Sequence, residues 1–132
     1  FSLGSGDLES GFWGYLMGFG SENLVILQKL EDAIEYAYCV FRKFPKSERF
    51  TLVADLKNRL YRMLELVVVA NKSKNKMPFL NDIDTELDVF RSLVRVSFRM
   101  KFLAPKQYEL ISVRFNEFGR LLGGWMRQNR KH

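Results

Sequence analysis

Three arginines stand four residues apart in the chain, at Arg91, Arg95 and Arg99. On a helix this spacing places all three side chains on one face, where like charges repel by about 0.2–0.5 kcal/mol per pair. Asp88 can pair with Arg91, but no acidic residue stands four positions before Arg95 or Arg99. A guanidinium group matches the oxygens of a phosphate or a carboxylate. The row therefore predicts contact with an external anion or with an acidic patch on a partner.

The charge of the chain favours a polyanionic partner. The first 21 residues contain two acids and no bases, so residues 22–132 hold 21 bases and 13 acids, a net charge of +8. Arg59, Arg62 and Arg114 are further candidates for a surface that contacts nucleic acid or a polymerase. Such an excess indicates binding of RNA or DNA through phosphates, and no RRM, KH or zinc-finger motif indicates base reading. The alternative is a solvated cationic face without a ligand.

Side chains for catalysis are scarce. The one histidine is His132, and the one cysteine, Cys39, is flanked by apolar or aromatic residues, which predicts an inert, partly buried thiol. Four acids at positions 82, 84, 86 and 88 lie near the start of a predicted helix, where they would favour its positive end. A magnesium site is the alternative for these acids. We therefore predict no enzyme, no cofactor and no metal.

The elements that must position these residues are helices. From position 22 onward, apolar residues recur at alternating spacings of three and four, which places them on one helical face. We expect Pro45 to end the first helix and Ser47 to cap the second. We expect residues 71–78 to form a loop, Asn81 and Asp82 to lead the third helix, and Ala104-Pro105 to break it.

Four helices joined by short loops predict an all-α, up-down-up-down four-helix bundle. No apolar run reaches the roughly 18 residues that a membrane span needs, so no membrane contact is expected.

Some helices carry a second apolar stripe, and this stripe predicts a subunit interface. On the third helix it includes Leu93, Val96, Met100 and Leu103. On the fourth helix, glycines at positions 119 and 123 would leave a smooth strip where another helix can approach. The alternatives are a wide core face for the stripe and a frayed helix end for the glycines. We name Leu93, Val96, Met100, Gly119 and Gly123 as the predicted interface, which does not give the number of subunits.

The first 21 residues differ in composition from the rest. They hold six of the nine glycines, a density that disfavours a regular helix. Phe12, Trp13 and Leu16 belong to an aromatic, apolar cluster and are candidate anchors for a groove on a partner protein. Three interpretations stay open: a fused segment with a linker-like Gly-Ser pair, a recognition peptide, or a native arm on a neighbouring subunit. We therefore separate residues 1–21 from a bundle domain at 22–132.

Four short segments resemble the Avd-like proteins, which are the accessory variability determinants of diversity-generating retroelements. They are ENLVI at 22–26, FPKSERF at 44–50, VANKS at 69–73 and GRLLGGW at 119–125. Each segment alone is a modest sign of the resemblance, but the order and spacing of the four over about residues 22–130 are specific to this family. The wider group includes four-helix-bundle proteins encoded in intervening sequences of ribosomal RNA genes.

The resemblance implies a homopentameric barrel of four-helix bundles, encoded by a bacterium or a phage and located in the cytoplasm. It also implies binding to a reverse transcriptase and to its template RNA, in support of error-prone copying and without catalysis. The alternative function is a structural oligomeric scaffold, engineered to display the N-terminal peptide, with no role in nucleic-acid binding.

Overall fold

The computed structural model describes residue 18 and residues 20–130. The described part contains four long helices and one short 3₁₀ helix: α2 at Ser21–Phe41, η1 at Lys46–Glu48, α3 at Leu52–Lys72, α4 at Met77–Arg99 and α5 at Pro105–Arg130. No strand occurs within these residues. The candidate anchors Phe12, Trp13 and Leu16 lie outside the described part of the chain.

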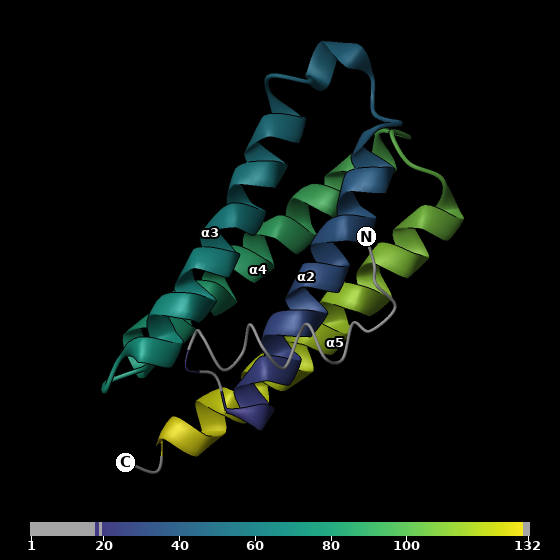
Figure 1. Cartoon of the computed structure of the whole chain (residues 1–132). Coiled ribbons are helices and arrows are strands. Elements are labelled where there is room, and N and C mark those ends of the chain that lie inside the picture. The colour runs from purple at the N-terminus through teal and green to yellow at the C-terminus, as the bar shows by residue number, and fades with distance from the viewer. Residues whose placement is uncertain (1–17, 19, 131–132) are drawn as a thin grey trace, which may run out of the picture.

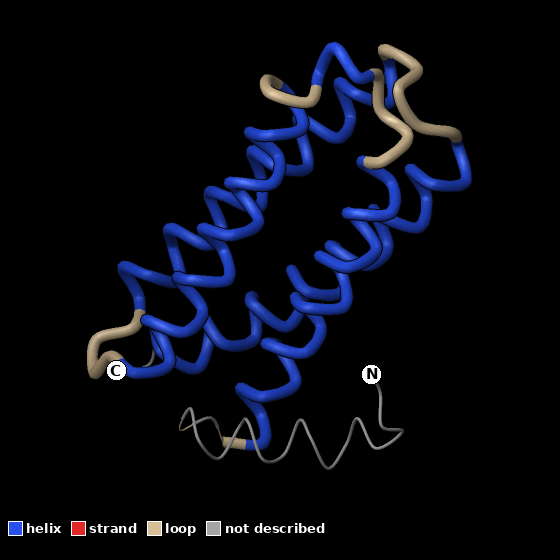
Figure 2. The backbone as a smooth tube through the Cα atoms, turned by 45° about the horizontal axis from the view of Figure 1, so that its top comes forward, coloured by secondary structure: helices blue, strands red, loops and turns tan. Residues whose placement is uncertain are grey.

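The four long helices form an antiparallel bundle. Consecutive helices run in opposite directions and lie side by side, as Figures 1 and 2 show. Each helix packs on the next in the sequence, and α2 packs on α5 to close the ring, while the backbones of the diagonal pairs stay more than 8 Å apart between Cα atoms. The predicted all-α four-helix bundle is therefore confirmed. None of the described helices is long and apolar enough to cross a membrane.

Apolar side chains from all four helices fill the interior. On α5 the buried residues include Ile111, Phe115, Phe118 and Leu122, which follow the predicted spacing of three and four. The ring centroids of Phe115 and Phe90 lie 4.6 Å apart, so aromatic packing joins α5 to α4 at the centre of the core.

The connection between α3 and α4 is shorter than the predicted loop at 71–78. Helix α3 runs to Lys72, and α4 already begins at Met77 with Pro78 in its first turn. Proline is tolerated there because the first helical N–H groups have no partner within the helix. The Lys76 ammonium also donates hydrogen bonds to the carbonyls of Ala70, Asn71 and Ser73, at 3.0, 3.1 and 2.7 Å. These bonds satisfy carbonyls at the end of α3. A longer connecting loop is therefore not needed to satisfy them.

Three other predicted boundaries were wrong. Helix α2 already ends at Phe41, before Pro45. Ser47 does not cap α3, because it lies inside η1 and Thr51 occupies the position before the helix. The Thr51 hydroxyl donates to a carboxylate oxygen of Glu48 at 2.7 Å instead of capping a backbone N–H. Helix α4 ends at Arg99 rather than at Ala104-Pro105, and Pro105 begins α5.

The turn after α4 has an identifiable local cause. Lys101 takes a left-handed conformation with φ of 67°, a position that often holds glycine at helix ends. The N–H of Phe102 then donates to the carbonyl of Ser97 at 3.0 Å, which closes the helix end. Phe102 packs against Phe44, with ring centroids 5.7 Å apart. This contact joins the end of α4 to the segment that follows α2, so both lie at the same end of the bundle.

Candidate nucleic-acid interface

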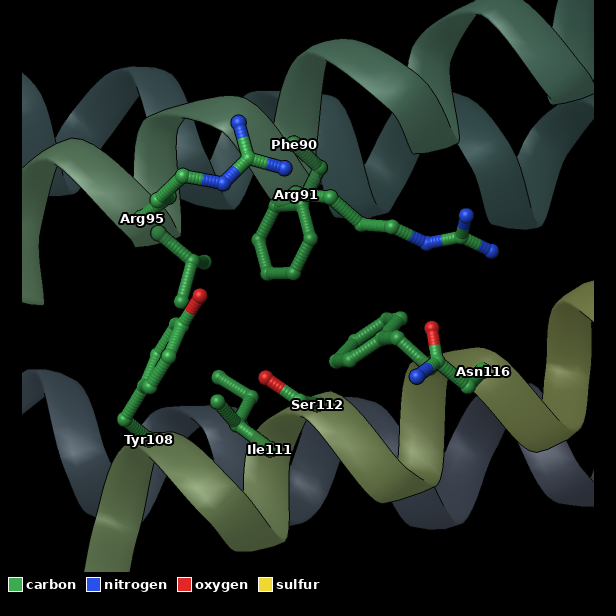
Figure 3. Close-up of a pocket in the computed structure, with 9 residues that line it drawn as sticks. Phe90, Arg91, Arg95, Tyr108, Ile111, Ser112 and Asn116 are labelled. Carbon is green, nitrogen blue, oxygen red and sulfur yellow. The ribbon is translucent and has the colours of Figure 1, made fainter. Parts of the chain in front are cut away.

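A groove lies between α4 and α5 and has a volume of about 350 Å³. Its α4 wall carries Arg91 and Arg95, and its α5 wall carries Tyr108, Ser112 and Asn116 (Figure 3). The buried rings of Phe90 and Phe115 line its floor. The groove therefore combines two cations with neutral side chains that can donate and accept hydrogen bonds, and no carboxylate of residues 20–130 lines it.

Arg91 lies across the space above Gly119 on α5. A Cβ atom added to Gly119 would come within 2.3 Å of Arg91 Nη2, so the absence of a side chain there makes room for the guanidinium. Arg91 Nη1 is 3.8 Å from a carboxylate oxygen of Asp88, which is a long ion pair. Arg91 Nε is buried and has no hydrogen-bond partner in the described part of the chain. Gly119 thus has a role within the chain, whereas its predicted role at a subunit interface stays a prediction.

Arg95 and Arg99 differ from Arg91 in their surroundings. Both are exposed, and neither lies within ion-pair distance of a carboxylate among residues 20–130. The absence of a partner agrees with the sequence, which places no acid four positions before either residue. Two guanidinium groups one helical turn apart are therefore available to an external anion.

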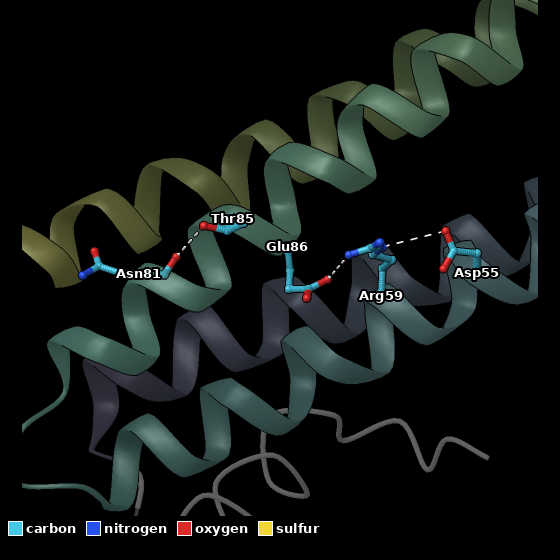
Figure 4. A network of polar contacts seen from close by, with 5 residues as sticks. All are labelled: Asp55, Arg59, Asn81, Thr85 and Glu86. Carbon is cyan, nitrogen blue, oxygen red and sulfur yellow. Dashed lines mark hydrogen bonds and ion pairs between the residues drawn. The ribbon is translucent and has the colours of Figure 1, made fainter.

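The two candidate arginines on α3 have partners inside the chain. Arg59 Nη1 binds a Glu86 carboxylate oxygen at 3.0 Å, and Arg59 Nε lies 3.8 Å from Asp55 (Figure 4). Arg62 pairs with Glu65 at 3.1 Å. Arg59 is on α3 and Glu86 is on α4, so this pair joins the two helices. The Glu86 side chain is only 22% exposed. Arg59 therefore has a structural role that its position in the sequence did not reveal.

Arg114 lies apart from the groove between α4 and α5. Its guanidinium carbon is 4.8 Å from the centroid of the Tyr36 ring on α2. This is a cation–π contact on the side of α5 that packs against α2. The structure thus brings Arg91 and Arg95 together at one groove and places Arg114 elsewhere.

Two polar residues of the groove escaped the sequence analysis. Ser112 and Asn116 stand four apart on α5 and face α4 (Figure 3). Their spacing is that of one helical face, and they interrupt the apolar residues of α5 on the side that faces the arginines. A search for uncharged polar residues beside the core stripe would have found them.

The acidic residues between positions 82 and 88 do not lie in the first turn of their helix. Because α4 begins at Met77, its first turn contains no acid, and the predicted interaction with the positive helix end is wrong. Glu86 instead binds Arg59. No group of three or more His, Cys, Asp or Glu among the described residues could hold a metal ion. Cys39 is exposed, which corrects the prediction of a partly buried thiol.

The second apolar stripe divides between core and surface. Leu103 is buried, and Leu93 is half-buried against the core, as a wide core face would predict. Val96 is 41% exposed, Met100 is 54% exposed, and Val113 on α5 is 58% exposed. At Gly123 an added Cβ would meet only Arg127, at 3.5 Å. Helix α5 continues through its glycines to Arg130, so it does not fray there.

Together the fold and the groove define a four-helix-bundle protein with a cationic cleft between its last two helices. The sequence matches the bAvd-like family over residues 24–129. The chain therefore belongs to the bAvd-like family, which confirms the resemblance to the accessory variability proteins of diversity-generating retroelements. None of the curated proteins matches this chain.

Proposed function

We propose that this chain is a non-catalytic accessory subunit that binds the template RNA of a retroelement and its reverse transcriptase. The observation that carries the proposal is the pair Arg95 and Arg99, which are exposed on α4 without a carboxylate partner among the described residues. Membership of the bAvd-like family supports the retroelement role. The protein would support mutagenic copying of RNA in the cytoplasm of a bacterium, and DNA offers the same phosphate chemistry.

The chemistry of the groove suits a nucleic-acid backbone better than a base edge. Arg95 in the groove, and Arg99 one turn further along α4, present planar donor groups that can each bind two phosphate oxygens. Ser112 and Asn116 add neutral hydrogen bonds to phosphate or sugar oxygens from the opposite wall. Contacts of this kind position a strand without reading its sequence, so we expect binding with little sequence preference and a strong salt dependence.

We propose further that the subunit acts as a homopentamer. Val96 and Met100 stand four apart on α4 and are both exposed, which supports an apolar contact with another copy. Val96→Asp/Met100→Asp should then give monomers in light scattering while the helical circular dichroism stays unchanged. Monomers in the wild type, or oligomers that survive the double substitution, would contradict this surface.

The test of RNA binding is fluorescence anisotropy with a labelled single-stranded RNA across a salt series. The variant Arg95→Glu/Arg99→Glu removes two cations and adds two anions on α4, one in the groove and one a helical turn beyond it. Its matched control is Lys106→Glu/Arg130→Glu, which changes the total charge equally at two exposed residues of α5. Circular dichroism of each variant checks the fold.

We expect the arginine variant to lose RNA binding and the control to lose much less. Each lost phosphate contact on a single strand lowers the slope of log K against log salt by about 0.7, so two contacts lower it by about 1.4. If both variants weaken binding equally, the loss of affinity comes from the change in net charge and not from a defined site. If the wild type does not bind RNA even at low salt, the scaffold function is favoured.

A further inference from the structure

A second hollow lies at the corner formed by the end of α2, η1 and the start of α3, and its volume is about 320 Å³. The corner is at the upper end of the bundle in Figure 1. Among the described residues, four cations line it, Arg42, Lys46, Arg49 and Lys57, and no carboxylate does. The remaining lining is aromatic or apolar and includes Tyr38. We call this site the cationic corner.

The charge of the corner is not neutralised by ion pairs of the described residues. None of the four lies within ion-pair distance of a carboxylate in the described residues. The two nearest acids in the sequence are engaged elsewhere, since Glu48 accepts a hydrogen bond from Thr51 and Asp55 lies beside Arg59. The positive charge of the corner is therefore not compensated by a carboxylate of the residues that the structure describes.

Helix dipoles explain only part of this charge. The C-terminal end of α2 favours a cation, which accounts for Arg42. Lys57, however, lies in the second turn of α3, near the positive end of that helix. Its ammonium is held 4.6 Å from the centroid of the Tyr38 ring, and the Tyr38 hydroxyl in turn bonds that of Tyr61. The fold thus holds a lysine at a position that no helix end favours, and a bound anion would stabilise it.

An exposed aromatic ring stands beside the cationic corner. Phe50 is 84% exposed, the highest value among the large apolar side chains that are exposed. The guanidinium carbon of Arg49 lies 6.0 Å from its ring centroid. An open aromatic face next to uncompensated cations is the combination that binds single-stranded nucleic acid, because bases stack on the ring while phosphates contact the cations.

The corner is connected to the arginine row by further cations. A hollow at the same end of the bundle is lined by Arg99 and Lys101 on one side and by Lys43 on the other. Lys43 is adjacent to Arg42 in the chain, and Arg99 is the last residue of α4. A strand that leaves the groove beyond Arg99 would therefore meet cations in both hollows, and no carboxylate of the described residues lines either hollow.

We infer that the cationic corner binds an unpaired segment of the RNA, with its phosphates on Lys46 and Arg49 and one base stacked on Phe50. This inference rests on the proposed function and adds a preference for single strands, which the arginine row alone does not provide. A duplex keeps its bases stacked inside, so it can use the cations but not the ring.

The experiment measures the affinity of the full chain for a labelled single-stranded RNA and for a duplex of the same length. Phe50→Ala removes the ring, and Phe50→Trp keeps an aromatic face. We expect Phe50→Ala to weaken single-strand binding about tenfold and to leave duplex binding unchanged. Phe50→Trp should restore the single-strand affinity. Lys46→Gln/Arg49→Gln should weaken both RNAs, whereas Lys106→Gln, at a lysine paired with Glu109, should weaken neither.

Three results would overturn the inference and leave the proposed function intact. In the first, Phe50→Ala binds single strands as the wild type does, while Arg95→Glu/Arg99→Glu does not bind. In the second, Phe50→Ala weakens single strands and duplex equally, which shows that the ring does not stack on a base. If Phe50→Ala loses only the reverse transcriptase, the ring belongs to a protein contact and the inference is wrong. A wild type that binds neither RNA refutes the proposed function itself.

Discussion

Replacing Gly119 by alanine tests whether Arg91 occupies the space that this glycine leaves open. In an exposed helix, alanine is more favourable than glycine by about 1 kcal/mol. At Gly119, however, the new Cβ would lie 2.3 Å from Arg91 Nη2 and 3.3 Å from Leu87 Cδ2. The guanidinium must move away, and Leu87, which is fully buried, must shift by a few tenths of an ångström.

The size of the effect follows from these contacts. Moving Arg91 costs its long pair with Asp88, which is worth about 0.3–0.5 kcal/mol for such a helical pair. Extra volume beside a packed side chain costs about 1 kcal/mol or more. The two costs offset the gain of about 1 kcal/mol in helix propensity. We therefore expect Gly119→Ala to leave the free energy of unfolding unchanged or to lower it by up to about 1 kcal/mol.

The matched control is Gly124→Ala on the same helix. There the nearest atom to the new Cβ is Arg127 Nη2 at 3.7 Å, an ordinary van der Waals distance. Gly124→Ala should therefore raise the free energy of unfolding by about 1 kcal/mol, or the melting temperature by about 4 °C. Urea unfolding at one protein concentration measures both variants.

A double-mutant cycle identifies Arg91 as the cause. In an Arg91→Ala background, Gly119→Ala should recover about 0.5–1 kcal/mol of its propensity gain. Gly119→Ala could instead stabilise the wild type as much as Gly124→Ala does. That result would show that Arg91 does not occupy the space beside Gly119.

Three further substitutions test the charge and packing of the bundle. Glu31→Gln should raise the melting temperature at pH 7, because partial burial and then repulsion from neighbouring acids raise the pKa of Glu31 above its usual 4.5 and disfavour the charged folded form. That gain should vanish as the pH of the melting experiment falls below 4.5, where the carboxyl is protonated in both states, and a constant gain would contradict it. Lys76→Met should lower the free energy of unfolding in urea by about 1 kcal/mol, because three carbonyls at the end of α3 lose their donor; no change would mean that water replaces the ammonium. Phe115→Ala should lower the free energy of unfolding by about 3–5 kcal/mol, and a loss below about 1 kcal/mol would show that this ring is not in the core.

The bundle was predictable because its pattern is periodic over whole helices. On α5 the buried residues follow a spacing of three and four for several turns, and this spacing is typical of a helix and not of a strand or a loop. The boundaries were less predictable because they depend on single side chains. Lys76 shortens the connection between α3 and α4 by donating to carbonyls, and Lys101 turns the chain after α4 in a conformation usually left to glycine.

The candidate site was predictable only where local sequence decides it. No acid stands one turn before Arg95 or Arg99, and neither has a carboxylate partner in the part of the chain that the structure describes. The partner of Arg59, in contrast, is Glu86 on a different helix, so only the folded chain reveals the pair. For the same reason the sequence did not show that Arg91 needs Gly119, or that Ser112 and Asn116 face the arginines.

The difference between paired and unpaired cations separates stability from binding in this bundle. Arg59 has the features of a stabilising arginine, because it is partly buried, 3.0 Å from a carboxylate, and placed between two helices. Arg95 and Arg99, in contrast, are exposed and have no carboxylate partner among the described residues. They also repel each other along the same helix face. Lys46 and Arg49 likewise line a hollow without a carboxylate. Unpaired cations of this kind cost the folded chain electrostatic free energy that an external anion can offset, so the groove and the cationic corner are the places where phosphates should bind.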